Sequence, residues 1–381
     1  MLVIRGREVA DFEEEPDVMK QLTWSARPIG IVLLCGVVFG VVGLRLGVFV
    51  PSTAVAAKAL AEAEPKVPLG LPPVYFPDDN PYSAAKVELG RLLYFDKRLS
   101  TDNTVSCASC HSPAKGFTDG AAVSTGINGQ KGGRSAPTVI NRAYSTRQFW
   151  DGRARSLEAQ AVGPIANPIE MTNLKTEKAA HAAVVDRLRG IDGYRRRFAA
   201  VFGTSDFTID HVGRAIATFE RTVLSGNAPF DRYINGNKTA LNASQQRGFN
   251  LFFKTLACDS CHLGFNFTDG SFENVGIGMD KSKPDLGRFA VTGKDSDKGS
   301  FKVPSLREIE HTGPYMHDGS VKTLEAVVEH YDRGAIKNSN LDVRMKPLKM
   351  SKRDKADLVS FLKALSGEGW QHIKSPKSFP K

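Results

Sequence analysis

Two short segments, Cys107-Ala-Ser-Cys110-His111 and Cys258-Asp-Ser-Cys261-His262, repeat one pattern of two cysteines followed at once by a histidine. This pattern is the attachment signature of c-type haem. Two thiols at this spacing can each add to one vinyl group of a haem, and the histidine then lies beneath the iron as its proximal ligand. A dithiol redox pair has no need of the histidine, and a zinc ribbon would place its second cysteine pair about 15–20 residues after the first. The sequence therefore predicts two covalently bound haem c groups.

The repetition extends well beyond the two motifs. A repeat this long indicates duplicated domains rather than a solenoid. The matching segments are Gly90-Arg-Leu-Leu-Tyr-Phe95 with Gly248-Phe-Asn-Leu-Phe-Phe253, Phe117-Thr-Asp-Gly120 with Phe267-Thr-Asp-Gly270, and Ser156-Leu-Glu-Ala159 with Thr323-Leu-Glu-Ala326. We therefore expect two cytochrome-c-like domains with one haem each, over residues 75–235 and 236–381.

Hydrophobic periodicity favours a mainly α fold. Apolar residues recur at helical spacing over residues 83–94, 209–224 and 351–365, and Ser351 precedes the last of these as a candidate helix cap. Residues 117–139 and 264–302 are rich in glycine and show no period. We expect these two segments to be long loops that wrap around the haems.

Residues 29–50 form an apolar segment that only Arg45 interrupts. The segment is long enough to cross a membrane as a transmembrane helix. A cleaved signal peptide is the alternative, because Ala54-Val55-Ala56 has the small-residue form of a cleavage site. We therefore expect a tail over residues 1–28, an anchor or signal over 29–50 and a linker over 51–74. Both alternatives place the haem domains in the periplasm, either tethered to the inner membrane or free.

Composition and charge restrict the classes of partner. The chain has 381 residues, of which 41% are hydrophobic and 24% charged, and this balance is typical of a globular protein. The formal net charge is +10. The basic residues are not clustered with aromatic residues as they are in nucleic-acid-binding proteins, so no nucleic-acid partner is expected. A basic surface is compatible with an acidic protein partner.

The two halves differ at one position of chemical importance. When Leu157 is registered with Leu324, Pro164 of the first half corresponds to Tyr331 of the second. A tyrosine phenolate can ligate haem iron, whereas proline has no donor side chain. We therefore expect the first haem to be open to a small molecule and the second to be closed by Tyr331. Met316 is the rival ligand, because thioether ligation is common in c-type cytochromes.

Residues 82–367 resemble the bacterial dihaem cytochrome c peroxidases, and among them the MauG branch. The segments that carry the resemblance are Gln130-Lys-Gly-Gly-Arg-Ser-Ala-Pro-Thr138, Gln148-Phe-Trp-Asp-Gly-Arg153, Ile169-Glu-Met171, Gly287-Arg-Phe-Ala-Val291, Pro314-Tyr-Met-His-Asp-Gly319 and Leu324-Glu-Ala-Val-Val-Glu-His-Tyr331. Conventional members have a methionine at the Tyr331 position and a haem-closing histidine where this chain has Ile127. Both differences imply the MauG type, in which the peroxide-reacting haem is permanently open.

The resemblance implies a peroxidase that reduces hydrogen peroxide at the haem held by His111. Glu170 then has the position of the general acid–base, Gln160 that of a hydrogen-bonding helper and Trp150 that of an aromatic bridge between the haems. The second haem, held by His262 and Tyr331, would share the oxidising equivalents in a bis-high-valent state. An electron-donor protein would then reduce both haems back to their resting state.

The resemblance also allows one calcium ion between the domains. The carbonyl donors of that site match Thr312 and Pro314, although Ser135 stands where the family has an asparagine. We expect His317 and His330 to support or pack against the haem sites.

Two other functions stay open on the sequence alone. One is a conventional cytochrome c peroxidase that takes electrons from a small cytochrome. The other is a dihaem electron carrier without catalytic activity, in which both irons have six ligands. Whether the sixth ligand position of the first haem is occupied separates these possibilities.

Overall fold

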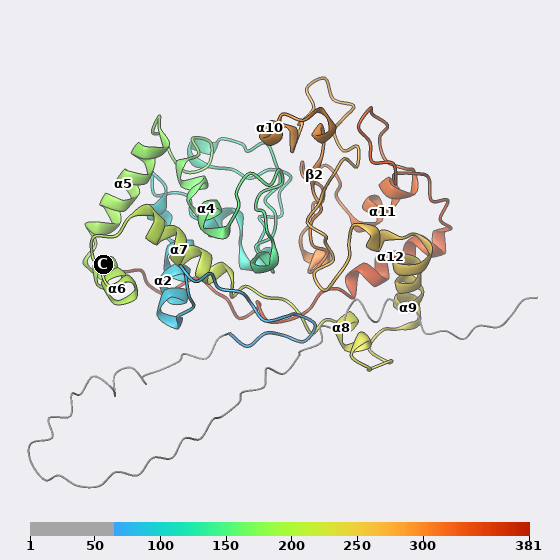
Figure 1. Ribbon diagram of the computed structural model, residues 1–381, viewed down its shortest axis with the longest axis horizontal. Coiled ribbons are helices and arrows are strands. Elements are labelled where there is room, and N and C mark those ends of the chain that lie inside the picture. Colours follow the sequence, from blue (N-terminus) through green and yellow to red (C-terminus); the bar gives the residue numbers. More distant parts are fainter. Residues whose placement is uncertain (1–64) are drawn as a thin grey trace, which may run out of the picture. The chain divides into compact units, whose positions relative to one another are not determined.

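Helices and long loops make up residues 65–381, the part of the chain that the computed structural model describes (Figure 1). The predicted tail, apolar segment and most of the linker lie outside these residues. Within residues 65–381 no helix is long and apolar enough to cross a membrane. The α-helices are α2 (Ala84–Phe95), α3 (Cys107–Cys110), α4 (Leu157–Val162), α5 (Glu177–Arg189), α6 (Asp192–Phe202), α7 (Ile209–Glu220), α8 (Pro229–Ile234), α9 (Ala243–Asn250), α10 (Phe289–Thr292), α11 (Leu324–Asp332) and α12 (Lys352–Lys363).

The predicted mainly α fold is confirmed. Within the described residues the only sheet pairs two short antiparallel strands, β1 (Phe272–Glu273) and β2 (Phe301–Lys302). Both strands lie in the second of the two segments that we expected to be loops. The first of these segments has one short 3₁₀ helix, Ile127–Gly129, and no other helix or strand.

Helix caps explain where the predicted helices begin. The Ser83 hydroxyl accepts a hydrogen bond from the backbone N–H of Lys86 at the start of α2. Ser351 and Asp354 form a reciprocal capping box at the start of α12. The predicted helix over residues 209–224 ends earlier, at Glu220. Its last apolar residues are buried in the turn that follows α7, so their periodicity reflects burial and not helix.

The same pairs of helices pack together in both halves of the chain. In the first half α7 packs against α2 and α4, and in the second half α12 packs against α9 and α11. Each crossing depends on a glycine of the repeated segment. A Cβ atom on Gly90 would lie 1.9 Å from the Ala215 carbonyl oxygen, and one on Gly248 would lie 2.1 Å from the Asp357 carbonyl oxygen. Only glycine allows the two backbones to approach this closely.

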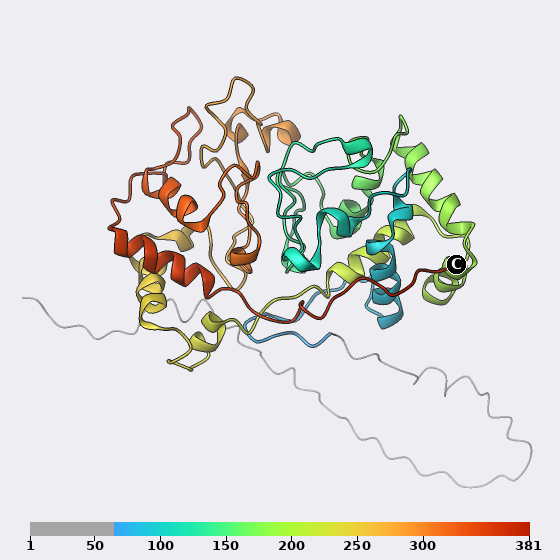
Figure 2. The same ribbon diagram turned by 180° about the vertical axis from the view of Figure 1, so that it is seen from behind.

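Two hydrophobic cores correspond to the two halves. The helices α2 and α4–α7 gather at one end of the described residues and α9, α11 and α12 at the other (Figures 1 and 2). The cores do not divide at the predicted boundary between residues 235 and 236. Phe230 of α8 belongs to the second core, and Trp370 and Ile373 of the C-terminal segment belong to the first. The chain end therefore returns to the first half, where the Gly193 N–H donates to the Lys381 carbonyl at 2.7 Å.

Candidate dihaem site

The first Cys-x-x-Cys-His segment lies at the wall of a cavity of about 340 Å³. Cys107 and Cys110 begin and end α3, and His111 caps this helix. The His111 Nδ1 atom lies 3.4 Å from the Phe117 carbonyl oxygen. Because a carbonyl can only accept, this contact requires the proton on Nδ1 and leaves the Nε2 lone pair free. Burial lowers the pKa of His111, which also favours the neutral ring that a metal binds.

The second segment repeats this arrangement at a cavity of about 280 Å³. The His262 Nδ1 atom lies 3.0 Å from the Phe267 carbonyl oxygen, and burial lowers the pKa of His262. Phe117 and Phe267 are fully buried and have left-handed backbones, with φ of 58° and 53°. This conformation is costly for a bulky residue, so its occurrence at both sites marks a constrained loop that aims a carbonyl at the histidine.

Both cavities fit a covalently bound haem. The four cysteines are free thiols that line the cavities, so each pair is available for thioether bonds. Each histidine presents a free ring nitrogen beside its thiol pair. The two volumes lie near the lower end of the usual range for cofactor sites. In this fit Cys107, Cys110 and His111 hold one haem, and Cys258, Cys261 and His262 hold the other.

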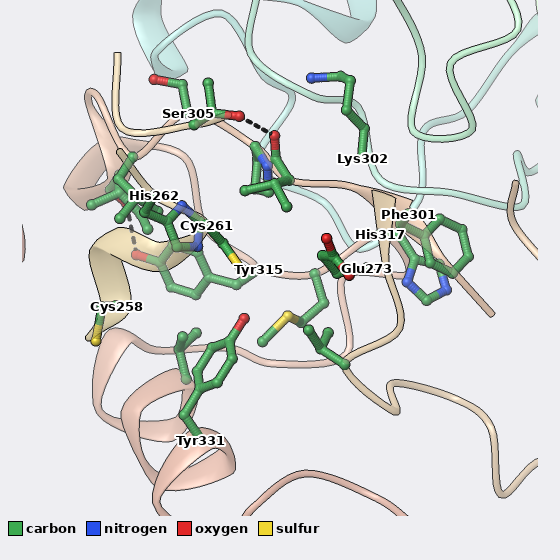
Figure 3. A pocket seen from close by; sticks show the side chains of 18 of the residues that line it. Cys258, Cys261, His262, Glu273, Phe301, Lys302, Ser305, Tyr315, His317 and Tyr331 are labelled. Atoms are coloured by element: carbon green, nitrogen blue, oxygen red, sulfur yellow. Dashed lines mark hydrogen bonds between the residues drawn. The ribbon is translucent and has the colours of Figure 1, made fainter. Parts of the chain in front are cut away.

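Tyr331 and Pro164 differ in the way that the register of the halves predicts. Tyr331 comes from α11, and its hydroxyl points into the second cavity (Figure 3). The hydroxyl has no hydrogen-bond partner among the described residues. Burial raises the pKa of Tyr331, so a bound cation is needed to hold it as a phenolate. Pro164 follows α4, lines the first cavity and offers no donor.

Met316 lines the same cavity as Tyr331 and therefore remains the rival ligand. Its backbone has a positive φ of 72°, as does that of Phe149, with φ of 67°, at the equivalent position of the first half. The two loops thus keep one conformation while the side chains differ. Ile127 does not line the first cavity and is buried in the first core instead.

Glu170 and Gln160 both line the first cavity, together with His111. The Glu170 carboxylate accepts a hydrogen bond of 2.6 Å from the Asn167 side chain. Burial raises the pKa of Glu170, and the positive charge of Arg153 and the Asn167 hydrogen bond oppose this effect. A buried carboxyl group with a raised pKa that lies in a cavity is suited to move protons.

Trp150 lines both cavities. Its indole N–H donates to the Ser135 carbonyl oxygen at 2.8 Å, and its own carbonyl accepts from the Lys302 backbone N–H at 2.8 Å. The ring is thus fixed between a loop of the first half and strand β2 of the second. Trp150 thus contacts both cavities, and its role as an aromatic bridge stays a prediction.

The predicted supporting histidines and calcium ligands lie in or near the second cavity. His317 stacks on Phe301 with ring centroids 3.6 Å apart, and His330 Nε2 lies 2.8 Å from the Val275 carbonyl oxygen. Thr312 and Pro314 line the second cavity. Among residues 65–381 no group of three or more histidine, cysteine or acidic side chains could hold a metal ion. The expected calcium ligands are backbone carbonyls, so calcium binding stays a prediction.

Sequence reasoning missed several residues of the two cavities. Arg153 lies over the Phe149 ring, 3.5 Å from its centroid, at the rim of the first cavity. Glu220 is buried in the wall of that cavity, and burial raises its pKa to about 8. Lys302 is buried in the wall of the second. Asn167 had a local signal, because an Asn-Pro pair three residues before Glu170 indicates a turn, whereas the charged residues had none.

Two cavities, each with a free thiol pair and a histidine whose tautomer is fixed, define a c-type cytochrome with two haem sites. Comparisons with known proteins agree. Residues 84–239 match the family model described as "Di-haem cytochrome c peroxidase". The methylamine utilization protein MauG of Methylorubrum extorquens is 44% identical over 77% of this chain and 81% of that protein. The cytochrome c551 peroxidase of Nitrosomonas europaea is 40% identical over 76% and 82%.

The fold agrees with the same relationship. The crystal structure of a MauG-like protein associated with microbial copper homeostasis aligns with a TM-score of 0.74 and 35% identity, over 81% of this chain and 97% of that one. The chain belongs to the dihaem cytochrome c peroxidase family, which includes MauG. The predictions of this family, of its two haems and of a peroxidase-type oxidoreductase are confirmed at the level of the family.

Proposed function

We propose that this protein is a MauG-type peroxidase, which reduces hydrogen peroxide in the first cavity and shares the oxidising equivalents between both haem sites. The observation that carries the proposal is the difference between Pro164 and Tyr331 at equivalent positions. When bound, the haems supply the redox chemistry, taking two electrons from the protein's donor for each peroxide reduced to two waters. The residues of the chain supply access, proton transfer and the path between the sites.

Access to the first site follows from the residues that line it. Among the described residues of this cavity His111 is the only histidine, and no methionine other than Met171, which is buried in the first core, is present. Pro164 cannot bind a metal, and Ile127 takes the place of the family's closing histidine. These features support a site that accepts peroxide without prior rearrangement, as opposed to a conventional peroxidase or an electron carrier.

Glu170 supplies the proton transfer. Its carboxyl group lines the cavity, has a raised pKa and is held in place by the hydrogen bond from the Asn167 side chain. We assign it to take the proton from one oxygen of hydrogen peroxide and return it to the other oxygen, which leaves as water. Gln160 lines the same cavity and can donate a hydrogen bond from its side-chain amide to the peroxide.

The second site is built to keep small molecules out. The Tyr331 hydroxyl and the His262 ring face the same cavity, so a haem between them would have both faces covered (Figure 3). An anionic oxygen ligand stabilises oxidised iron. Trp150 lies between the two cavities and offers the route for electrons. The reducing partner is an electron-donor protein of the same compartment, which we place in the periplasm on the basis of covalent haem and the apolar segment over residues 29–50.

Electron paramagnetic resonance of the purified ferric protein tests the proposal. We expect one high-spin signal from the first haem and one low-spin signal from the second, and the loss of both when one equivalent of peroxide is added. Two low-spin signals that peroxide leaves unchanged would show an electron carrier. Two low-spin signals in the ferric protein, with an open ligand position on the first haem that appears only on partial reduction, would show a conventional peroxidase.

A further inference from the structure

Lys302 is a buried cation without an anionic partner. Its side chain is 4% exposed, and it lines the second cavity. Its backbone N–H donates to Trp150, but its ammonium group has no hydrogen bond or ion pair with any described residue. Burying an ammonium group costs several kcal/mol unless an opposite charge or hydrogen-bond acceptors compensate it. The structure therefore lacks the group that would stabilise Lys302.

A second cation increases this cost. Arg142 lines both cavities, and its only side-chain hydrogen bond among the described residues runs from Nε to the Gln148 side chain at 3.0 Å. Burial lowers the pKa of Lys302 far below its ordinary value, and the nearby charge of Arg142 lowers it further. Two like charges in one wall between two cavities are stable together only when anions approach them.

Glu220, in the wall of the first cavity, is the buried acid whose charge acts on Arg142, and it makes no ion pair with Lys302. The acidic side chains of the second cavity do not supply an anion for Lys302 either. Glu273 and Asp342 both line it, but each already pairs with Arg344, at 3.0 Å and 2.7 Å. The direction of the Lys302 side chain agrees with this. In Figure 3 it leaves β2 on the side away from Phe301 and His317 and extends toward the blue-green ribbon of the first half. Among the described residues no acidic side chain forms an ion pair with the Lys302 ammonium group.

We propose that Lys302 binds a carboxylate of the haem held by His262. Arg142, which lines both cavities, is the second cation available to the haem carboxylates. A haem carries two propionate groups, which are the anions that a covalently attached haem would bring to this wall. The inference rests on the proposed haem in the second cavity. It assigns to Lys302 an electrostatic role, because a cation near the iron disfavours the ferric state and raises the reduction potential.

The test is a spectroelectrochemical titration of the holoprotein that resolves both haems. We expect Lys302→Met to lower the midpoint potential of the second haem, because the carboxylate loses its counter-charge. Lys302→Arg keeps the charge and should keep the potential close to that of the wild type. Lys346→Met is the matched control, because Lys346 lines the same cavity but is exposed, so that solvent screens its charge. Equal potentials in Lys302→Met and Lys346→Met would overturn the proposal.

A second measurement covers the case in which Lys302→Met does not fold. Resonance Raman spectra of Lys302→Arg should show a shifted propionate bending band, because the guanidinium group replaces the ammonium group as the hydrogen-bond donor. An unchanged band in this variant would overturn the proposal. A purified protein without two covalent haems would instead overturn the proposed function, so the two failures are distinct.

Discussion

Pro164 and Tyr331 occupy equivalent positions in the two halves, and each lines the cavity of its own half. The surrounding frame is the same on both sides. Pro164 comes just after α4, which Ser156 caps, and Tyr331 lies in the last turn of α11, which Thr323 caps. The duplicated frame thus places an equivalent residue in the wall of each cavity that also contains the histidine, and the two residues differ in whether the side chain carries a donor atom.

Replacing Tyr331 by phenylalanine removes the donor and keeps the ring. We expect Tyr331→Phe to change the low-spin signal of the second haem and to abolish the sharing of oxidising equivalents after peroxide addition, because the anionic oxygen is lost. Absorbance and electron paramagnetic resonance spectra before and after one equivalent of peroxide would show this.

Tyr315→Phe is the matched control for that experiment. Tyr315 lines the same cavity, but its hydroxyl already donates to the Ile309 carbonyl oxygen at 3.0 Å. We expect its spectra to stay close to those of the wild type. If Tyr331→Phe also keeps the wild-type signals while Met316→Leu loses them, Met316 and not Tyr331 is the ligand.

Replacing Glu170 by glutamine keeps the shape of the side chain and removes the base. We expect the reaction with peroxide to slow by about 10²–10⁴-fold, the usual contribution of a general acid–base, with no change in the resting spectrum. Stopped-flow absorbance gives the rate. Glu177→Gln is the control, because Glu177 is exposed on α5 and does not line the cavity. An unaltered rate in Glu170→Gln would remove this residue from the mechanism.

The pH dependence of the same rate gives an independent check on Glu170. Burial raises its pKa, so the carboxyl group is protonated, and inactive as a base, up to a higher pH than an exposed glutamate. The rate in the wild type should therefore fall as the pH is lowered through this raised pKa and level off above it. Glu170→Gln should lack that step. A step that persists in the variant belongs to another group, for which Glu220 is the candidate.

The sequence predicted the parts of the site that depend on local spacing. The Cys-x-x-Cys-His pattern defines each attachment point within five residues, and the internal repeat pairs Pro164 with Tyr331 without any knowledge of the fold. The helix cap at Ser351 was likewise local. These features could be predicted because one segment of chain contains all the atoms involved.

The wall between the cavities could not be predicted in this way. In the sequence, Lys302 is a lysine of a glycine-rich segment with no feature that predicts burial. It is buried in the fold, where its backbone N–H donates to the Trp150 carbonyl of the other half. The division of the cores was missed for a related reason. Trp370 and Ile373 follow the last helix in sequence, yet they pack into the first core because the chain crosses back. Such contacts depend on long-range packing that has no periodic signal.

Replacing Trp150 by phenylalanine should slow electron transfer between the two sites. The smaller ring loses the hydrogen bond to the Ser135 carbonyl oxygen and part of the contact with both cavities. We expect the first haem to react with peroxide at the wild-type rate and the second to be oxidised more slowly, as followed by stopped-flow absorbance. Trp370→Phe is the control, because Trp370 is buried in the first core and lines neither cavity. Equal rates in both variants would mean that the electrons take another route.

Replacing Gly90 by alanine should destabilise the first half. The added methyl group would meet the Ala215 carbonyl oxygen of α7, and a backbone atom cannot move aside without separating the helices. Overpacking of this kind costs about 1–3 kcal/mol, and we expect a loss of that size in the free energy of unfolding. Chemical denaturation followed by circular dichroism measures it. Gly133→Ala is the control, because a Cβ atom there meets nothing within 4 Å. Equal stabilities for the two variants would contradict the close crossing of α2 and α7.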